Sequence, residues 1–257
     1  MLQPGASFNL AAHVKYFVRC LQVLPAPYAS LDTNRLTVAY FAVSGLDILG
    51  ALDRVDAKRI IEWIYSLQVL PPAGDEAEAA APGRLAGFRG GSFMGGAHST
   101  AGAPSSSEYD EGHLAMTYTA LAVLLILKDD LSRVRRAEVL AFVRSLQDRH
   151  GCFCAYSGGE SDMRFLYCAT AICTMLRDEE WTGVDVPRAT AYVLSSQNYD
   201  GGLGLGPGQA RRRRRHLHCH SRIHRRLHRR RHRRRHRRRR RQRVRLRLPI
   251  LLLPRRR

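Results

Sequence analysis

The feature that most constrains the fold of this chain is an internal repeat. The run Cys-Leu-Gln-Val-Leu-Pro at 20–25 returns as Ser-Leu-Gln-Val-Leu-Pro at 66–71, and weaker copies carry Gln147 and Gln197. The intervals between successive glutamines are 46, 79 and 50 residues. Removing roughly 30 residues from the long interval, as a surface insertion within 72–108, restores a period of about 50. The spacing therefore predicts an array of similar units.

A second series of similar runs is in phase with the first. Runs at 37–42, 116–120 and 165–169 each open a long apolar segment, and Tyr118 and Tyr167 are 49 residues apart. The segments before each glutamine instead repeat apolar residues at i, i+3, i+4 and i+7, as an amphipathic helix does. Ala, Leu and Met favour helix in both kinds of segment. Each unit is therefore predicted to be an amphipathic outer helix followed by a more buried inner helix.

This pattern gives specific expectations for the elements. Residues 72–108 should be mostly irregular, because they combine Pro, Gly and Ser with little apolar periodicity. An irregular helical bundle is the alternative fold, and it leaves the shared phase of the two series unexplained. We predict inner helices near 35–49, 112–127 and 163–176, and outer helices near 10–23, 55–68, 134–147 and 187–196.

The net charge of +20 is confined to one end of the chain. Residues 211–257 contain 25 Arg, no Lys and no acid, whereas residues 1–210 contain 17 Lys and Arg against 22 Asp and Glu. The first 210 residues therefore form a mildly acidic body with no block of like charge to follow a phosphate backbone. We divide the chain into a repeat domain at 1–210 and an Arg/His-rich, low-complexity tail at 211–257.

The tail has a composition with a genetic explanation. Arg, His, Leu, Pro and Gln fill 42 of its 47 positions, and all five have codons that begin with C. This bias favours a frameshift or gene-model artefact in GC-rich coding DNA. The alternative is a real basic tail, disordered by self-repulsion, that binds RNA, DNA or anionic lipid through charge.

Membrane-spanning and secreted classes are not expected. The longest apolar stretch, 114–127, is too short and too polar to span a bilayer, and the N-terminal residues lack a basic region followed by an apolar run. Cys168 and Cys173 fall in an apolar helical pattern, where free cysteine behaves as a small buried hydrophobe. We therefore expect a cytoplasmic protein.

Several longer runs carry a family resemblance: 19–25, 35–47, 61–68, 112–119, 129–134 and 162–165. Together with the Gln and Gly-aromatic repeat, they resemble the β subunits of protein prenyltransferases, which belong with the squalene cyclases to the α/α-toroid superfamily. Within that family the runs are most similar to protein geranylgeranyltransferase type I. The resemblance covers 13–208 and implies an all-α toroid of helical hairpins, with about three and a half of about six hairpins present.

The resemblance also implies a reaction and partners. A zinc-bound thiolate, from a cysteine near the C-terminus of a substrate protein, attacks C1 of geranylgeranyl diphosphate, and diphosphate leaves. Apolar inner helices supply the funnel that holds the isoprenoid. The implied partners are a prenyltransferase α subunit, in a heterodimer, and substrates such as small GTPases with a C-terminal CaaX motif in which X is usually Leu.

Isoprenoid-lining positions of the family match Thr37, Phe41, Arg164 and Tyr167. Arg164 lies one turn before Tyr167, so one face of an inner helix can carry both. A small Thr37 in place of a bulky aromatic residue leaves room for another isoprene unit. Two alternatives stay open: Arg164 caps or pairs with the helix start at Asp162, and Thr37 and Phe41 serve ordinary packing.

The pocket that selects the last residue of the substrate motif matches Thr37, His113, Ala115 and Phe165. A small and mostly apolar pocket of this kind suits Leu. His113 could equally be a helix-start residue with a satisfied hydrogen bond, as lone histidines often are.

The family's zinc ligands include an Asp-x-Cys pair, and no Asp stands two residues before any of the six cysteines. The cluster His150, Cys152 and Cys154 is too tightly spaced for a usual zinc site. The residues that hold most of the diphosphate are also missing. We therefore expect no metal ligands and no catalytic residues in this chain, and an inactive β subunit. The alternative is a non-catalytic, truncated scaffold or a polybasic-tailed binder of nucleic acid or anionic lipid.

Overall fold

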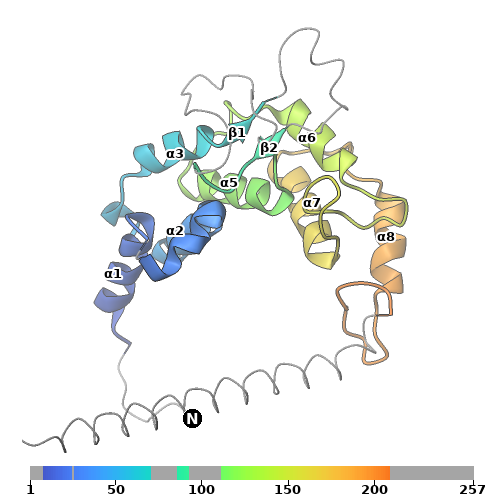
Figure 1. The fold of residues 1–257 in the computed structure, drawn as a ribbon, viewed down its shortest axis with the longest axis horizontal. Helices are drawn as coiled ribbons and strands as arrows, with labels where there is room; N and C mark the ends of the chain where they lie inside the picture. Colours follow the sequence, from blue (N-terminus) through green and yellow to red (C-terminus); the bar gives the residue numbers. More distant parts are fainter. Residues whose placement is uncertain (1–7, 25, 71–85, 93–110, 209–257) are drawn as a thin grey trace, which may run out of the picture. The chain divides into compact units, whose positions relative to one another are not determined.

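The computed structural model describes residues 8–24, 26–70, 86–92 and 111–208. Contacts divide the chain into units 1–207 and 208–257. Every element below belongs to the first unit, and the second lies outside the described residues apart from Gly208. Helices dominate the described part of the chain (Figure 1).

The elements alternate along the chain in the order expected for helical hairpins. Two short 3-10 helices, Ala26–Asn34 and Leu52–Arg54, precede α2 and α3 respectively. The α-helices are α1 (Leu10–Leu21), α2 (Arg35–Ile48), α3 (Ala57–Tyr65), α5 (Leu114–Ile126), α6 (Arg136–Ser145), α7 (Met163–Met175) and α8 (Val186–Ser195), and the strands are β1 (Gln68–Val69) and β2 (Gly87–Phe88).

These bounds confirm the predicted helices, with one correction. The outer helix expected to run to residue 68 ends at Tyr65, and Gln68 instead pairs with Phe88 in an antiparallel two-stranded sheet. The helix ends early because Gln68 begins a turn. The backbone of this turn pairs with Gly87 and Phe88, the Gly-aromatic pair that follows. That pair also lies within 72–108, so the described part of this segment, 86–92, is not wholly irregular; 71–85 and 93–110 lie outside the described residues.

The same turn follows the outer helices α3, α6 and α8. Gln68 pairs with Phe88, Gln147 with Phe153 and Gln197 with Leu203, each in antiparallel register. The carbonyl two residues beyond each partner then accepts a hydrogen bond from the start of an inner helix. Gly90 accepts from the Leu36 N–H at 2.9 Å, Ala155 from Leu114 at 2.8 Å and Leu205 from Met163 at 2.9 Å. Each turn therefore caps the inner helix of the preceding unit.

The inner helices also end alike. A residue in the left-handed region follows each of them: Gly50 at φ 63°, Lys128 at φ 66° and Arg177 at φ 54°. The next N–H then returns to the helix, from Ala51 to Leu46, from Asp129 to Leu124 and from Asp178 to Cys173. This arrangement satisfies carbonyls that a helix end leaves open.

The inner helices α2, α5 and α7 pack in that order, and α1 packs along α2 (Figure 1). Gly45 allows the closest approach of α1, because a Cβ atom there would lie 2.6 Å from the Phe17 ring. The core lies between the inner and outer helices, where Phe88, Phe142, Phe153 and Leu121 are completely buried. Burial of such side chains contributes about 1.5–3 kcal/mol each.

Two of the repeated glutamines, Gln68 and Gln147, each join one outer helix to the next. The Gln147 side chain accepts from the Asp185 N–H at 2.6 Å and donates to the Asp185 carbonyl at 3.1 Å, at the N-cap of α8. Gln68 likewise accepts from the Arg135 N–H at 2.9 Å and donates to the Arg133 carbonyl at 3.2 Å, at the start of α6. We call this two-bond contact the glutamine clamp.

We predict that Gln147→Ala destabilises the chain, because two backbone groups at the start of α8 lose their partner. The expected cost is about 2 kcal/mol, which lowers the melting temperature by about 4–8 °C for a domain of this size. Gln22→Ala, at an exposed copy of the same repeat position, is the control. Equal melting temperatures for Gln147→Ala and Gln22→Ala, followed by circular dichroism, would contradict the role of the clamp.

Candidate functional site

A row of tyrosines crosses the three inner helices. Tyr40 of α2 and Tyr118 of α5 place their hydroxyl oxygens 3.1 Å apart, and those of Tyr118 and Tyr167 of α7 lie 3.4 Å apart. The rings meet edge to face, with centroids 5.7 and 5.5 Å apart. Burial, followed by the hydrogen bonds to Tyr167 and Tyr40, raises the pKa of Tyr118. Tyr118 is therefore uncharged at neutral pH, and two contacts join the three hydroxyls of the row.

Exposed apolar residues accompany this tyrosine row. Phe41 is 64% exposed and Tyr167 is 59% exposed, although both lie on inner helices. The pattern continues two turns further on, where Ile48 and Leu125 are also exposed. Phe41 and Ile48 share one face of α2, and Tyr118 and Leu125 share one face of α5, because each pair has i, i+7 spacing. Exposed apolar patches of this kind mark ligand or interaction surfaces.

Thr37 and Phe41 lie on this part of α2. Thr37 is half-buried, and its hydroxyl oxygen lies 3.4 Å from the sulfur of Met116 on α5. The Phe41 ring packs against Tyr40 with centroids 5.4 Å apart. The structure thus connects Thr37 to α5 and Phe41 to the tyrosine row.

The predicted specificity pocket is only partly assembled by direct contacts. The ring of His113 lies 6.2 Å from that of Phe165 and 5.9 Å from that of Tyr156. His113 is also the N-cap of α5, where its Nδ1 accepts from the Ala115 N–H at 3.2 Å. The helix-start role of His113 and its contact with Phe165 therefore coexist, and Thr37 meets the neighbouring Met116 rather than Ala115.

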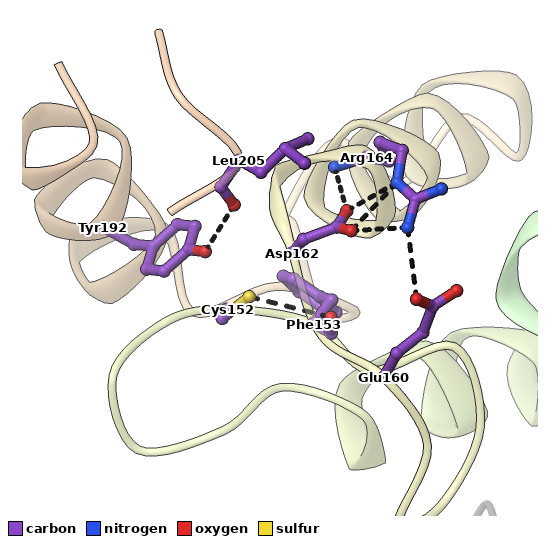
Figure 2. Close-up of polar contacts among 7 residues, drawn as sticks. All are labelled: Cys152, Phe153, Glu160, Asp162, Arg164, Tyr192 and Leu205. Carbon is purple, nitrogen blue, oxygen red and sulfur yellow. Dashed lines mark hydrogen bonds and ion pairs between the residues drawn. The ribbon is translucent and has the colours of Figure 1, made fainter. Parts of the chain in front are cut away.

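Arg164 is held at the start of α7 by two carboxylates (Figure 2). Its guanidinium donates to both carboxylate oxygens of Asp162, at 2.6–3.0 Å, and to Glu160 at 3.3 Å. These partners raise the pKa of Arg164 above its ordinary value, with the hydrogen bond to Asp162 as the largest cause. Asp162 also accepts from the Arg164 N–H as the helix N-cap. The alternative structural role of Arg164 is thus present, and its guanidinium also lies 5.4 Å from the Phe165 ring centroid.

Tyr40 and Tyr118 were missed as candidate site residues. The sequence signal that could have found them is the second repeat series, in which Tyr40, Tyr118 and Tyr167 occupy equivalent places near the start of each inner helix. The sequence does not give the distance between the inner helices, and the hydroxyl contacts form only because this distance is short enough.

The described residues do not fit a zinc ion. No three of their His, Cys, Asp or Glu side chains come together as a metal site would require. Burial raises the pKa of Cys168 to about 11 and that of Cys173 to about 12, which is the opposite of what a thiolate ligand needs. Cys219 lies outside the described residues.

Comparison with known proteins decides the family. The prenyltransferase alpha-alpha toroid domain matches residues 8–212, most of the chain. This chain belongs to the prenyltransferase alpha-alpha toroid family. The inner and outer helices, the glutamine clamp and the tyrosine row are therefore features of a prenyltransferase toroid domain.

The relatives of this toroid domain include β subunits of two kinds of prenyltransferase. It is 38% identical over 203 residues to geranylgeranyl transferase type-1 subunit beta of Arabidopsis thaliana, covering 79% of this chain and 52% of that protein. The corresponding subunit of Dictyostelium discoideum is 35% identical, over 78% of this chain and 58% of that protein. Protein farnesyltransferase subunit beta of Schizosaccharomyces pombe is 29% identical, over 77% and 44%. The chain thus spans about half the length of the curated relatives it matches.

A solved structure shares the toroid fold. Candida albicans protein geranylgeranyltransferase-I complexed with GGPP aligns with a TM-score of 0.59 at 21% identity, covering 78% of this chain and 54% of that chain. The all-α, hairpin-repeat fold is thereby confirmed. Within the ranges that the structure describes, no helix is long and apolar enough to cross a membrane.

We predict that His113 makes the stability of this toroid domain depend on pH. Burial lowers the pKa of His113 below its ordinary value, with Glu160 opposing the shift. The unfolded chain therefore binds a proton more readily than the folded chain, so stability is complete above about pH 6.5 and declines as the pH falls below it. His113→Asn keeps a helix-capping side chain but removes the titration.

The measurement is the melting temperature between pH 7.5 and 5.5. We expect His113→Asn to lose less stability than the parent chain over this interval, whereas His150→Asn, at an exposed position, should behave as the parent does. Parallel pH profiles for the parent and His113→Asn would contradict the prediction.

Proposed function

We propose that residues 8–208 are the isoprenoid-binding part of a protein geranylgeranyltransferase type I β subunit. The observation that carries the proposal is the tyrosine row with exposed apolar residues beside it on the inner helices. Two relatives named as type-1 β subunits, at 38% and 35% identity, support geranylgeranyl over farnesyl, because the farnesyltransferase relative is 29% identical. The fold neighbour complexed with GGPP supports the same ligand.

The tyrosine row suits an apolar chain for a physical reason. A buried hydroxyl without a partner costs about 1–3 kcal/mol. Here the hydroxyls of Tyr40, Tyr118 and Tyr167 already bond to one another. An isoprenoid that covers the rings would therefore remove apolar surface from water and would leave one O–H donor of the three to be paired, rather than three. Isoprene units gain about 0.8 kcal/mol for each buried methylene group.

The proposed reaction joins the isoprenoid to the cysteine of a CaaX motif. The substrate sulfur forms a bond to C1 of geranylgeranyl diphosphate while the bond from C1 to the diphosphate oxygen breaks. The roles that this chain's residues supply are binding and orientation, with Thr37, Phe41, Arg164 and Tyr167 lining the isoprenoid site. Thr37, His113, Ala115 and Phe165 would contact the last residue of the motif. A partner α subunit, small GTPase substrates and a cytoplasmic location belong to the same proposal.

We predict that Thr37→Trp selects the shorter isoprenoid. In the proposed site the added ring would occupy the volume beside Thr37 that the additional isoprene unit requires, and overpacking of this kind costs about 1–3 kcal/mol. Binding of a non-hydrolysable geranylgeranyl diphosphate analogue, measured by fluorescence titration, should weaken about 10- to 100-fold. The farnesyl analogue should bind as it does to the parent.

Lys58→Trp, at an exposed position in the first turn of α3, is the control and should bind both analogues as the parent does. Equal weakening of both analogues by Thr37→Trp would show that Thr37 packs the fold rather than sets chain length. Absence of binding to either analogue by the parent chain would refute the proposed function.

We predict that the 257-residue chain does not transfer geranylgeranyl, even with a prenyltransferase α subunit and zinc. No Asp-x-Cys pair occurs in its sequence, and among the described residues no metal-binding group forms. The assay is prenylation of a fluorescent peptide that ends in Cys-x-x-Leu. The complete Arabidopsis thaliana relative, assayed with the same α subunit preparation, is the positive control. Zinc-dependent labelling by this chain would overturn the prediction.

A further inference from the structure

The three tyrosines of the row stand at the same level of their helices. Tyr40, Tyr118 and Tyr167 each lie four residues, about one helical turn, after a residue whose N–H donates to a turn carbonyl. The residues with these capped N–H groups are Leu36, Leu114 and Met163. The backbone caps therefore set the height of each ring, and the hydroxyl of Tyr118 in the middle reaches both of its neighbours, at 3.1 and 3.4 Å.

The row has more hydrogen-bond donors than contacts. Each tyrosine hydroxyl brings one O–H donor, so the row brings three. Two contacts join the three hydroxyls, and each contact uses one donor whichever way the protons point. These hydroxyls have no further hydrogen-bond partner among the described residues. One donor is therefore left for solvent or a ligand, and Tyr118 is the member of the row that takes part in both contacts.

Two buried tyrosines elsewhere in the chain are paired differently. The Tyr65 hydroxyl donates to the Asp129 carboxylate at 2.6 Å, and the Tyr192 hydroxyl donates to the Leu205 carbonyl at 3.0 Å (Figure 2). Both tyrosines are at most 7% exposed, and both use an acceptor that belongs to the surrounding fold. The row instead pairs hydroxyl with hydroxyl, beside exposed apolar residues such as Phe41. A molecule that covers the row therefore needs to supply one acceptor at most.

We propose that Tyr118 is a positioning residue for the hydrocarbon tail of the ligand, because its hydroxyl keeps two of the three donors of the row paired when the tail covers them. Tyr118 acts through the hydroxyls of Tyr40 and Tyr167, and not through a hydrogen bond to the ligand. The affinity of the surface for a hydrocarbon then falls as the number of unpaired donors rises. The proposal rests on the proposed function, since it concerns the same surface.

Substitution by phenylalanine changes the number of unpaired donors in a way that distinguishes the middle of the row from its ends. Tyr118→Phe removes both contacts and leaves two hydroxyls, so two donors are unpaired instead of one. Adding Tyr40→Phe leaves the hydroxyl of Tyr167 alone, and the number returns to one. Phenylalanine at all three positions leaves no donor. The ring is retained in every case, so these variants change the hydroxyl pairing while the apolar surface of the rings is kept.

The experiment measures the binding of two probes to the full 257-residue chain by fluorescence titration. One probe is diphenylhexatriene, a hydrocarbon without any hydrogen-bonding group, and the other is the non-hydrolysable geranylgeranyl diphosphate analogue. Tyr118→Phe should weaken the binding of both probes about tenfold, because one more donor is covered without a partner. Tyr118→Phe combined with Tyr40→Phe should recover this loss. The triple variant, which adds Tyr167→Phe, should bind diphenylhexatriene about tenfold more tightly than the parent.

Matched controls are Tyr28→Phe and Tyr199→Phe, which remove a hydroxyl at exposed positions outside the row. Both should bind the two probes as the parent does, and circular dichroism verifies that each variant is folded. A variant with the two changes Tyr118→Phe and Tyr40→Phe that binds diphenylhexatriene no better than Tyr118→Phe alone overturns the proposal, because the loss would then come from packing or from direct contact with the ligand.

The remaining outcomes separate this proposal from the proposed function. Unchanged binding of diphenylhexatriene by Tyr118→Phe, or no binding of it by the parent chain, overturns the role of Tyr118. Binding of diphenylhexatriene that follows the number of unpaired donors supports that role. If the geranylgeranyl diphosphate analogue fails to bind in the same experiment, the proposed function is refuted and the role of Tyr118 in accepting a hydrocarbon stands.

Discussion

The hydrogen bonds between each glutamine turn and the helix ends around it are the contacts on which the array depends. The described α-helices contain 9 to 14 residues, and helices of this length are marginal in water on their own. The turns that carry Gln68 and Gln147 each supply two things that such helices need. The backbone carbonyl of the turn caps an inner helix, as Ala155 caps α5, and the glutamine holds the start of an outer helix, as Gln147 holds α8. The surrounding apolar burial then stabilises helices whose ends are already satisfied.

Repetition of this contact is what builds the candidate site. Because α2, α5 and α7 start at equivalent backbone acceptors, equivalent side chains reach the same level on neighbouring helices. Tyr118 and Tyr167, 49 residues apart in the sequence, therefore meet at 3.4 Å. The site consequently depends on the outer layer as well as on its own side chains.

Most of the helices could be predicted from the sequence, and each wrong or missing prediction has a physical cause. Periodicity located the helices, because their apolar stripes and their spacing are properties of the sequence alone. Periodicity extended the outer helix beyond Tyr65, because no residue next to Gln68 marks the end of the helix. The residue that draws Gln68 into a turn is its pairing partner Phe88, which lies 20 residues further on across an insertion. The sequence left two roles open for His113 and for Arg164, one in a binding site and one at a helix start. The structure shows the contacts at both helix starts, where His113 accepts from the Ala115 N–H and Asp162 accepts from the Arg164 N–H. Tyr40 and Tyr118 were missed, since a hydroxyl contact between helices depends on packing distances that no local pattern encodes.

The polar groups of the exposed apolar surface on the inner helices limit what that surface can bind. Two contacts join the hydroxyls of Tyr40, Tyr118 and Tyr167, so two of the three O–H donors are paired within the row and one is not. A ligand that covers the rings therefore leaves one donor to be paired, whereas three separate hydroxyls would leave three. Contact between the inner helices thus lowers the cost of covering this surface with a hydrocarbon, which is the kind of ligand that the proposed function requires.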